Sequence, residues 1–586
     1  MEQKKQQQIA EEITAGEPVT RRSFLRKGAA AIGGITAVSA AGEARSSQPS
    51  LKPSSYLDLL RTPDYVTAYG NFAQMLPGGR IVLQRTGEQW RGGQVMVETA
   101  VKQDALVLAL TAPSTPVVAV HVRWNVPVTP GLRALGDAWE RSYGELGWRD
   151  LIPERAMPWY FATHDGAASH GYGVRTDAAA LCFWQLDPEG VSLWLNVANG
   201  GDGVELGPRQ LTMASVVTHR GLGESSQEAV AGLCRKLCAR AARPAAPIYG
   251  ANDWNYSYGK STAETILRDT EFTVELSPRA AVRPFSVIDD GWRKGPPAWP
   301  DMGKLAADIR RTTARPGIWI RPLEAPPGTI AGLLLPAARF GEKAARASEL
   351  AYDPTIPESQ EKIRRKMRQV IEWGYEMVKH DFTTYDLLGQ WGYEMGALPT
   401  LPGWSLHDRS RTNAEVIATL YALLREAAGE RTMLDGCNTI SLLGQGIFDL
   451  QRSGDDTSGR LWERTRRMGV NTLAFRLPQH GVFSALDPDM VGITEAIPWE
   501  LNRQWLDAVA RSGTVTFIAA GPAARGQEQR AAIREAFSLA AAGGTAARPV
   551  DWMDSSTPER WQATGKAGTE LRYRWSGVDG ALAFPV

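Results

Sequence analysis

Two short acidic segments contain the residues best suited to chemistry. Residues 378–381 read Val-Lys-His-Asp and residues 454–457 read Gly-Asp-Asp-Thr, and each follows or ends a short apolar stretch typical of a buried strand. A carboxylate at the end of a buried strand loses water, which is costly and therefore indicates a site. Two such carboxylates on two strands of one array can act as nucleophile and acid on one bond, the arrangement that cleaves glycosidic linkages.

Both segments also have a purely structural interpretation. In the first, the two-residue period of a strand puts Lys379 and Asp381 on one face, and a neighbouring ammonium favours the ionised carboxylate that a nucleophile needs. A buried ion pair without chemistry would show the same pattern. In the second, either Asp455 or Asp456 can be the general acid, because a neighbouring carboxylate helps an acid to stay protonated. The same residues also suit a turn.

Polar and aromatic residues follow two further apolar stretches. Asp289 and Asp290 can accept hydrogen bonds from sugar hydroxyls, and Trp292 can cover the apolar face of a sugar ring. A calcium site is the rival interpretation, but further acidic ligands at loop spacing are missing. Asp253 and Trp254 repeat the combination of polar and aromatic residues after an earlier stretch.

The second half of the chain alternates short apolar stretches with longer amphipathic ones, which predicts a (β/α)8 TIM barrel over residues 244–545. In such barrels the chemistry lies at the carboxyl ends of the strands. The predicted strands are 248–251, 285–289, 317–321, 375–379, 432–434, 447–451, 472–476 and 514–519, and helices are predicted at 358–374, 411–429, 461–470, 499–511 and 528–541. His480 follows the seventh of these strands, where binding a substrate and lying on the surface are equally good interpretations.

The segment before the barrel reads mainly as β-structure. Short apolar runs separated by Gly, Pro, Asp and Asn predict a β-sandwich, and with its linker this domain covers residues 45–243. The aromatic stretch 139–159 interrupts the pattern, and we expect it to form a loop that reaches over a neighbouring site. Residues 546–586 predict only a short C-terminal β extension, with one hairpin that pairs 570–575 with 581–585.

The N-terminus predicts export. Arg21 and Arg22 are followed by Ser-Phe-Leu and by a weakly apolar stretch rich in Ala and Gly, which resembles a twin-arginine signal over residues 1–44. We therefore expect a periplasmic or secreted protein. No other apolar run reaches the ~20 residues that span a bilayer, so no stable membrane insertion is expected. The four cysteines are expected to be buried thiols, with a Cys234–Cys238 bridge as the alternative.

Composition narrows the class of partner. Lys and Arg number 65 against 64 Asp and Glu, a net charge of +1, which does not favour a nucleic acid or an acidic membrane as partner. The 20 Trp residues serve either large cores or the stacking of sugar rings, with equal weight. The expected mechanism needs no cofactor and no metal, and homo-oligomer formation is left open.

Four segments together resemble glycoside hydrolase family 36, the α-galactosidases (melibiases) and raffinose synthases, in the clan shared with families 27 and 31. They are residues 352–381, which end in the Lys-x-Asp of the first acidic segment, Asp-Asp-Gly-Trp at 289–292, Leu-Asp-Gly-Cys-Asn at 434–438, and Ser-Gly-Asp-Asp-Thr-Ser-Gly at 453–459. The resemblance implies that Asp381 is the nucleophile and Asp455 the acid/base. Asp456 is the alternative, because Arg452 and Asp456 have the arginine-to-acid spacing of family 27.

The chain departs from that family in several places. Arg321 stands where the family carries a glutamate, His380 where tryptophan is usual, and the C-terminal β-domain is nearly absent. Arg321 and His480 would suit an acidic sugar. We expect a divergent, exported, retaining exo-α-glycosidase, with a raffinose-synthase-like transglycosylase or a non-catalytic glycan-binding protein as alternatives. The expected substrate-binding residues are Asp253, Trp254, Asp289, Asp290, Trp292, Arg321, Lys379, Arg452 and His480.

Overall fold

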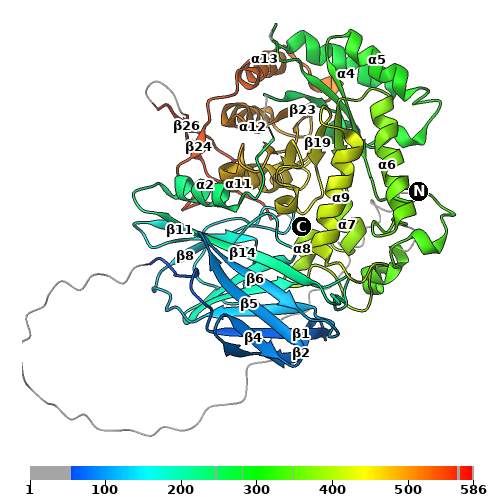
Figure 1. Cartoon of the computed structure of the whole chain (residues 1–586). Helices are drawn as coiled ribbons and strands as arrows, with labels where there is room; N and C mark the ends of the chain where they lie inside the picture. Colours follow the sequence, from blue (N-terminus) through cyan, green and yellow to red (C-terminus); the bar gives the residue numbers. More distant parts are fainter. Residues whose placement is uncertain (1–54, 244–246, 280, 347–348, 564–567, 584–586) are drawn as a thin grey trace, which may run out of the picture. The chain divides into compact units, whose positions relative to one another are not determined.

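The computed structural model describes residues 55–243, 247–279, 281–346, 349–563 and 568–583 (Figure 1). The predicted signal at 1–44, most of the predicted linker and the predicted boundary at 244 lie outside the described residues. Within them, no helix combines the length and the apolar character that crossing a bilayer requires.

The N-terminal β region, residues 65–221, consists of two antiparallel sheets. The first has the strand order β2 (Leu76–Val82), β1 (Tyr65–Ala73), β7 (Ala119–Trp124), β13 (Gly190–Asn196), β12 (Leu181–Asp187) and β9 (Met157–Pro158). The second has the order β3 (Gln84–Thr86), β4 (Gln89–Gly92), β5 (Val95–Lys102), β6 (Ala105–Thr111), β14 (Gln210–Gly221), β11 (Ser169–Val174), β10 (Tyr160–His164) and β8 (Arg133–Gly136). This architecture confirms a β-rich N-terminal half.

Alternating side chains build the core between these two sheets. Val191, Leu193 and Leu195 of β13 are fully buried because they share one face of the strand. Phe161 of β10 and Trp184 of β12 meet across the two sheets, with ring centroids 5.4 Å apart. Helix α2 (Ser226–Leu237), which begins with a capping box, then covers β11 and β14.

The second half forms a curled parallel sheet of nine strands, here called the barrel-like sheet. Its order is β21 (Ala485–Asp487), β20 (Leu450–Arg452), β19 (Met433–Gly436), β18 (Met377–His380), β17 (Arg315–Ile320), β16 (Phe285–Ile288), β15 (Tyr249–Asn252), β23 (Thr516–Ala520) and β22 (Val491–Ile493). Only residues 488–490 separate the two edge strands along the chain. The sheet confirms a TIM-like arrangement, while full closure stays a prediction.

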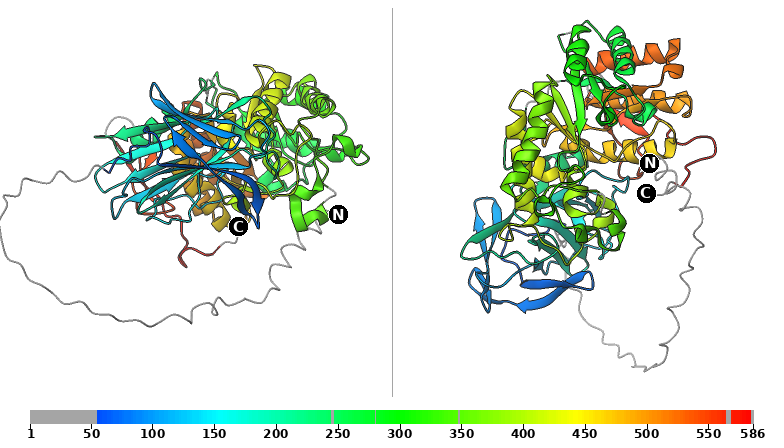
Figure 2. Two further views of the ribbon diagram at one scale, coloured as in Figure 1. Left: turned by 60° about the horizontal axis from the view of Figure 1, so that its bottom comes forward. Right: turned by 90° about the vertical axis from the view of Figure 1, so that its right-hand side faces the viewer.

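Helices flank the outer face of the barrel-like sheet (Figure 2). They include α4 (Ala263–Leu276), α5 (Met302–Arg311), α6 (Pro357–Glu372), α9 (Asn413–Ala428), α12 (Trp499–Ser512) and α13 (Gln527–Ala541). The predicted seventh strand at 472–476 is wrong. Those residues form helix α11 (Thr472–Arg476), which continues α10 (Trp462–Thr465) through the π-helical turn η5 (Arg466–Asn471). The strand position is taken by β21 and β22 instead.

The interior of the barrel-like sheet changes from apolar to charged along the strands. Phe285, Met377 and Leu450 belong to an apolar cluster at the inward positions of β16, β18 and β20. Two residues further along β18 and β20, the inward positions hold Lys379 and Arg452, both buried. Charges are thus gathered where the strands end, which is where barrel chemistry is expected.

The C-terminal segment is a small sheet of three short strands, β24 (Arg548–Pro549), β25 (Arg560–Gln562) and β26 (Glu570–Arg572). The predicted hairpin is therefore wrong in its pairing. Strand β26 pairs with β25, and residues 581–583 are not in a strand. The short extension itself is as expected, and it includes the fully buried Trp561 and Trp575.

Candidate active site

The first acidic segment places Asp381 at the carboxyl end of β18, on the inward side of the barrel-like sheet. Phe382 has a left-handed backbone conformation, with φ of +61°, and its N–H donates to Asp381 Oδ1 at 2.8 Å. The indole Nε1 of Trp319 donates to Oδ2 at 3.2 Å. Two neutral donors therefore hold this carboxylate in place and leave it 9% exposed. This is a suitable setting for a nucleophile, because the two donors fix the orientation of the carboxylate.

Lys379 pairs with Asp289 and not with Asp381, contrary to our expectation. Its Nζ lies 2.7 Å from Asp289 Oδ2, and both side chains are buried. Asn252 donates to the same oxygen at 2.9 Å. Burial lowers the pKa of Lys379, but the negative charge of Asp289 raises it. The net result is a pKa well above the ordinary value of a lysine. The ammonium is therefore charged at the floor of the site.

Asp253 and Asp290 occupy different surroundings. Asp253 is buried, and its oxygens accept from the Asp289 N–H and from the hydroxyls of Ser257 and Ser261 at 2.6–2.9 Å. Burial, followed by the charge of Asp289, raises the pKa of Asp253 to about 6. Asp290 is partly exposed and pairs with Arg293 at 3.1 Å. Asp253 thus positions Asp289, whereas Asp290 lies nearer to solvent.

The two tryptophans predicted to meet sugar are partly buried. Trp292 donates from Nε1 to the Trp319 carbonyl at 2.9 Å, and its ring meets Trp373 edge to face at 5.8 Å. Trp254, in the short helix α3 (Trp254–Ser257), packs against the apolar cluster inside the barrel-like sheet and against Tyr258. Both rings have extensive protein contacts in this structure.

The second acidic segment follows β20 through a turn that requires glycine. A Cβ on Gly454 would lie 2.1 Å from the Met468 carbonyl oxygen, so no larger residue fits. Asp455 comes next, and both of its oxygens face arginine. Arg464 NH2 is 2.5 Å from Oδ2, and Arg141 NH2 is 2.6 Å from Oδ1. Asp455 is thus held by two cations, one from α10 and one from the N-terminal β region.

Asp456 is bound differently. Arg452, which is fully buried, lies 3.2 Å from Asp456 Oδ1 and 3.2 Å from Asp489 Oδ1. Burial alone would raise the pKa of Asp456, but the charges of Arg452 and Arg141 outweigh it and hold the pKa well below its usual range. Asp456 is therefore an anion at neutral pH, which makes it a poor general acid.

The aromatic stretch 139–159 reaches the end of β20. Ser142 donates from its N–H to the Ser453 carbonyl at 3.0 Å and accepts from the Asp455 N–H at 2.9 Å. Arg141 therefore lies among the strand ends. Its NH1 is 3.9 Å from Asp381 Oδ1 and 3.1 Å from Cys437 Sγ, and its NH2 is 2.6 Å from Asp455 Oδ1. Sequence reasoning found the loop but missed its arginine, because nothing local marks which residue of the loop points inward.

A buried carboxyl pair was also missed. Asp435 of β19 is 1% exposed and its Oδ1 has no hydrogen-bond partner among the described residues. Burial, together with the charge of Asp487 at the end of β21, raises the pKa of Asp435 well above its ordinary value. The charges of Lys379 and Arg452 act on the pKa of both carboxyls in the opposite direction. Alternation along 432–436 could have placed Asp435 inward, but Asp487 lies in the strand that the sequence did not reveal.

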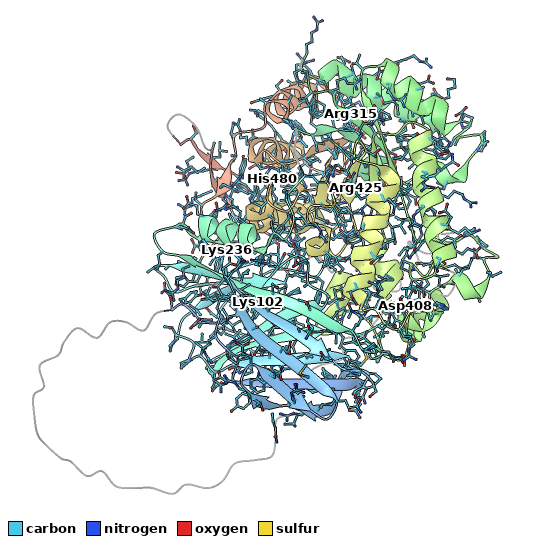
Figure 3. The ribbon with its side chains drawn as sticks, viewed as in Figure 1. Lys102, Lys236, Arg315, Asp408, Arg425 and His480 are labelled. Atoms are coloured by element: carbon cyan, nitrogen blue, oxygen red, sulfur yellow. The ribbon has the colours of Figure 1, made fainter. Side chains whose placement is uncertain are left out.

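Two residues predicted to bind substrate lie elsewhere or have other partners. His480, which is labelled in Figure 3, accepts at Nδ1 from the Leu486 N–H, and Arg548 lies near it. It therefore sits beside the amino end of β21. Arg321 binds Asp386, with NH2 at 2.5 Å from Oδ1, and Glu349 at 3.0 Å. Neither side chain is placed to meet a sugar carboxylate, so the suggestion of an acidic sugar loses its basis.

The fold is that of α-galactosidases solved previously. The chain resembles TtGalA, an α-galactosidase from Thermus thermophilus in complex with p-nitrophenyl α-D-galactopyranoside, with a TM-score of 0.55 and 18% identity over 85% of this chain and 97% of that one. A variant of the family 36 α-galactosidase AgaA from Geobacillus stearothermophilus, in complex with 1-deoxygalactonojirimycin, gives 0.53 and 12% over 86% and 77%. No protein-family model and no curated protein sequence matches the chain. At these identities the likeness shows a family 36-like fold.

Proposed function

We propose that the protein is a retaining exo-α-glycosidase of α-galactosidase type that acts on terminal α-linked sugars. One observation carries the proposal: Asp381 and Asp455 follow two parallel strands at the same end of the barrel-like sheet and both face the guanidinium of Arg141, at 3.9 and 2.6 Å. Their contact with one guanidinium brings the two carboxyls to one site, as the double-displacement mechanism requires, and that mechanism expects them ~5–5.5 Å apart. The complexes of the similar structures with α-galactosides support the substrate class.

In the first step Asp381 attacks the anomeric carbon and forms an ester with it. The bond to the leaving oxygen breaks, and that oxygen takes the proton of Asp455. In this structure each oxygen of Asp455 contacts an arginine. One of these two contacts must lengthen before the Asp455 carboxyl can carry a proton. Arg464 is the more mobile candidate, because its side chain is 26% exposed against 6% for Arg141.

In the second step Asp455, now ionised, takes a proton from water. The water oxygen attacks the anomeric carbon, and Asp381 leaves as a carboxylate, so the configuration of the sugar is retained. Lys379 and Asp289 lie on the floor of the site, where an ammonium and a carboxylate can bind sugar hydroxyls. Asp290 is the further acceptor nearer to solvent.

We also propose export by the twin-arginine route, which rests on Arg21 and Arg22 and the apolar stretch after them. Periplasmic or secreted material after fractionation supports it. Retention of the protein in the cytoplasm, with the same result after Arg21→Lys and Arg22→Lys, contradicts it.

A non-catalytic glycan-binding protein is the second candidate, and the pairing of Asp455 with two arginines favours it. A panel of aryl α- and β-glycosides, including galactosides, glucosides, N-acetylated sugars and uronides, separates the two. The proposal expects hydrolysis of an α-glycoside, with the α-anomer as first product by NMR. Binding without turnover across the panel supports the second candidate, and release of the β-anomer excludes retention.

A further inference from the structure

Arg141 is the side chain of the N-terminal β region that reaches the carboxylates. Its guanidinium contacts Asp455 at 2.6 Å, Asp456 at 3.8 Å and Asp381 at 3.9 Å. The ring of Trp391 covers it at 5.7 Å. The side chain is 6% exposed, and its Nε has no partner among the described residues. Burying a guanidinium is costly, so this placement needs an explanation beyond packing.

We propose that Arg141 is a positioning residue that couples the charges of Asp381 and Asp455 through the two steps. This inference rests on the proposed function. In the first step Asp381 loses its charge on forming the ester, and Asp455 becomes an anion on giving up its proton. In the second step both changes reverse. One of the two carboxylates facing Arg141 is therefore an anion at every stage, and the buried cation always has a partner.

The loop holds Arg141 in this place through three anchors. Backbone hydrogen bonds join Ser142 to both sides of Gly454, as described above. Arg476, which is 1% exposed, donates from NH2 to the Glu140 carbonyl at 2.6 Å and from NH1 to the Ser453 carbonyl at 3.0 Å. The Glu140 side chain accepts from the Gly392 N–H at 2.8 Å. The β region thus completes the site with a fixed cation.

Several charged or titratable groups face Arg141, and the test must separate them. They are Asp381 after β18, Cys437 after β19, Asp455 and Asp456 after β20, with Arg452 and Arg464 beside these last two, and Glu140 and Tyr143 on the same loop. Glu140 matters most, because burial raises its pKa to about 7. Asp455→Asn can be assayed with an activated aryl glycoside, whose leaving group needs little help from an acid. If the basic limb of the pH profile belongs to Asp455, this variant should lose it.

The test is the pH dependence of kcat/KM for Arg141→Gln. The substitution removes the positive charge that both carboxylates face, so both limbs should move upward, and kcat should fall about 100-fold. Arg209→Gln is the matched control. Arg209 also joins the β region to the second half, through Glu415 at 2.7 Å, but it lies outside this site. Both limbs of the pH profile of Arg209→Gln should lie at the same pH as in the wild type.

Lower activity with unshifted limbs would show that Arg141 only holds the loop, and it overturns the inference. Unchanged activity does so as well. Arg141→Lys serves if the glutamine variant fails to fold. One ammonium cannot reach both carboxylates, so the limb of the carboxylate that loses its contact should move upward while kcat falls, and unshifted limbs overturn the inference for this variant too. Absence of turnover by the wild type on every glycoside defeats the proposed function instead.

Discussion

The two acidic segments hold their carboxylates in opposite ways. Neutral donors, the Phe382 N–H and the Trp319 indole, orient Asp381, and the nearest cation is 3.9 Å away. Two arginines bind Asp455 directly, at 2.5 and 2.6 Å. A nucleophile must keep its lone pairs available for attack, whereas an acid/base alternates between two charge states. The difference matches the roles that we propose, and it can be tested one segment at a time.

The largest effect is expected for the first segment. Asp381→Ala should lower kcat at least about 10⁴-fold, because no other group can form the ester. Thermal unfolding should change little, since water can reach the freed donors. Asp187→Ala removes a carboxylate that pairs with Arg123 in the N-terminal β region, and it should leave kcat unchanged. An Asp381→Ala variant that retains turnover removes the nucleophile assignment.

The second segment should show a graded effect. Asp455→Asn should lose about 10²–10⁴-fold on substrates with poor leaving groups, much less on activated aryl glycosides, and regain activity with azide. Asp456→Asn should lose less than about 10-fold, because Asp456 is held as an anion by Arg452 and Arg141. Steady-state kinetics on both substrate types checks this. The reverse ranking, with azide rescue of the Asp456 variant, exchanges the two roles.

Breaking the Lys379–Asp289 ion pair beneath the two segments should lower the stability of the protein. Lys379→Met leaves the buried Asp289 without its cation and should cost about 3–5 kcal/mol in the free energy of unfolding. The double variant Lys379→Met/Asp289→Asn should recover part of this, as measured by urea denaturation. If the single and double variants lose the same free energy of unfolding, the Lys379–Asp289 ion pair does not stabilise this part of the structure.

The smallest effect concerns His380, which points away from Asp381 into the outer layer. It is fully buried against Phe448, and burial lowers its pKa to about 3. The unfolded chain binds this proton near pH 6.5. Between these values only the unfolded state is protonated, so stability should fall as pH falls, by up to about 1.4 kcal/mol per pH unit. His380→Phe should show a flatter unfolding profile from pH 6.5 to 5, and identical slopes contradict the burial argument.

The sequence predicted correctly those strands that a local pattern of apolar and charged residues marks. The strands that carry Asp289, Lys379 and Asp435 were found because each is a short apolar run before a charged end. The seventh strand was missed for two reasons. Residues 472–476 form a short, mostly apolar run that mimics a strand, although they continue a helix. The true strand is split into two pieces of three residues each, β21 and β22.

The electrostatics of the site could not be predicted in the same way. Arg141 lies more than 200 residues before its partners along the chain, and Arg464 lies in a helix that read as an ordinary amphipathic segment. Lys379 illustrates the limit most clearly. Its neighbour in sequence is Asp381, but its partner in space is Asp289, because the barrel-like sheet brings the end of β16 to face β18. Pairing across strands depends on tertiary structure.

The most direct test of the account is to trap the covalent intermediate. Asp455→Ala incubated with an activated aryl α-galactoside should accumulate a glycosyl-enzyme, because ester formation needs no acid with a good leaving group while deglycosylation lacks its base. Intact-protein mass spectrometry should show the mass of one hexosyl group, and peptide mapping should place it on Asp381. An adduct on another residue, or hydrolysis to the β-anomer with no adduct, contradicts the claim that Asp381 is the nucleophile of a retaining glycosidase.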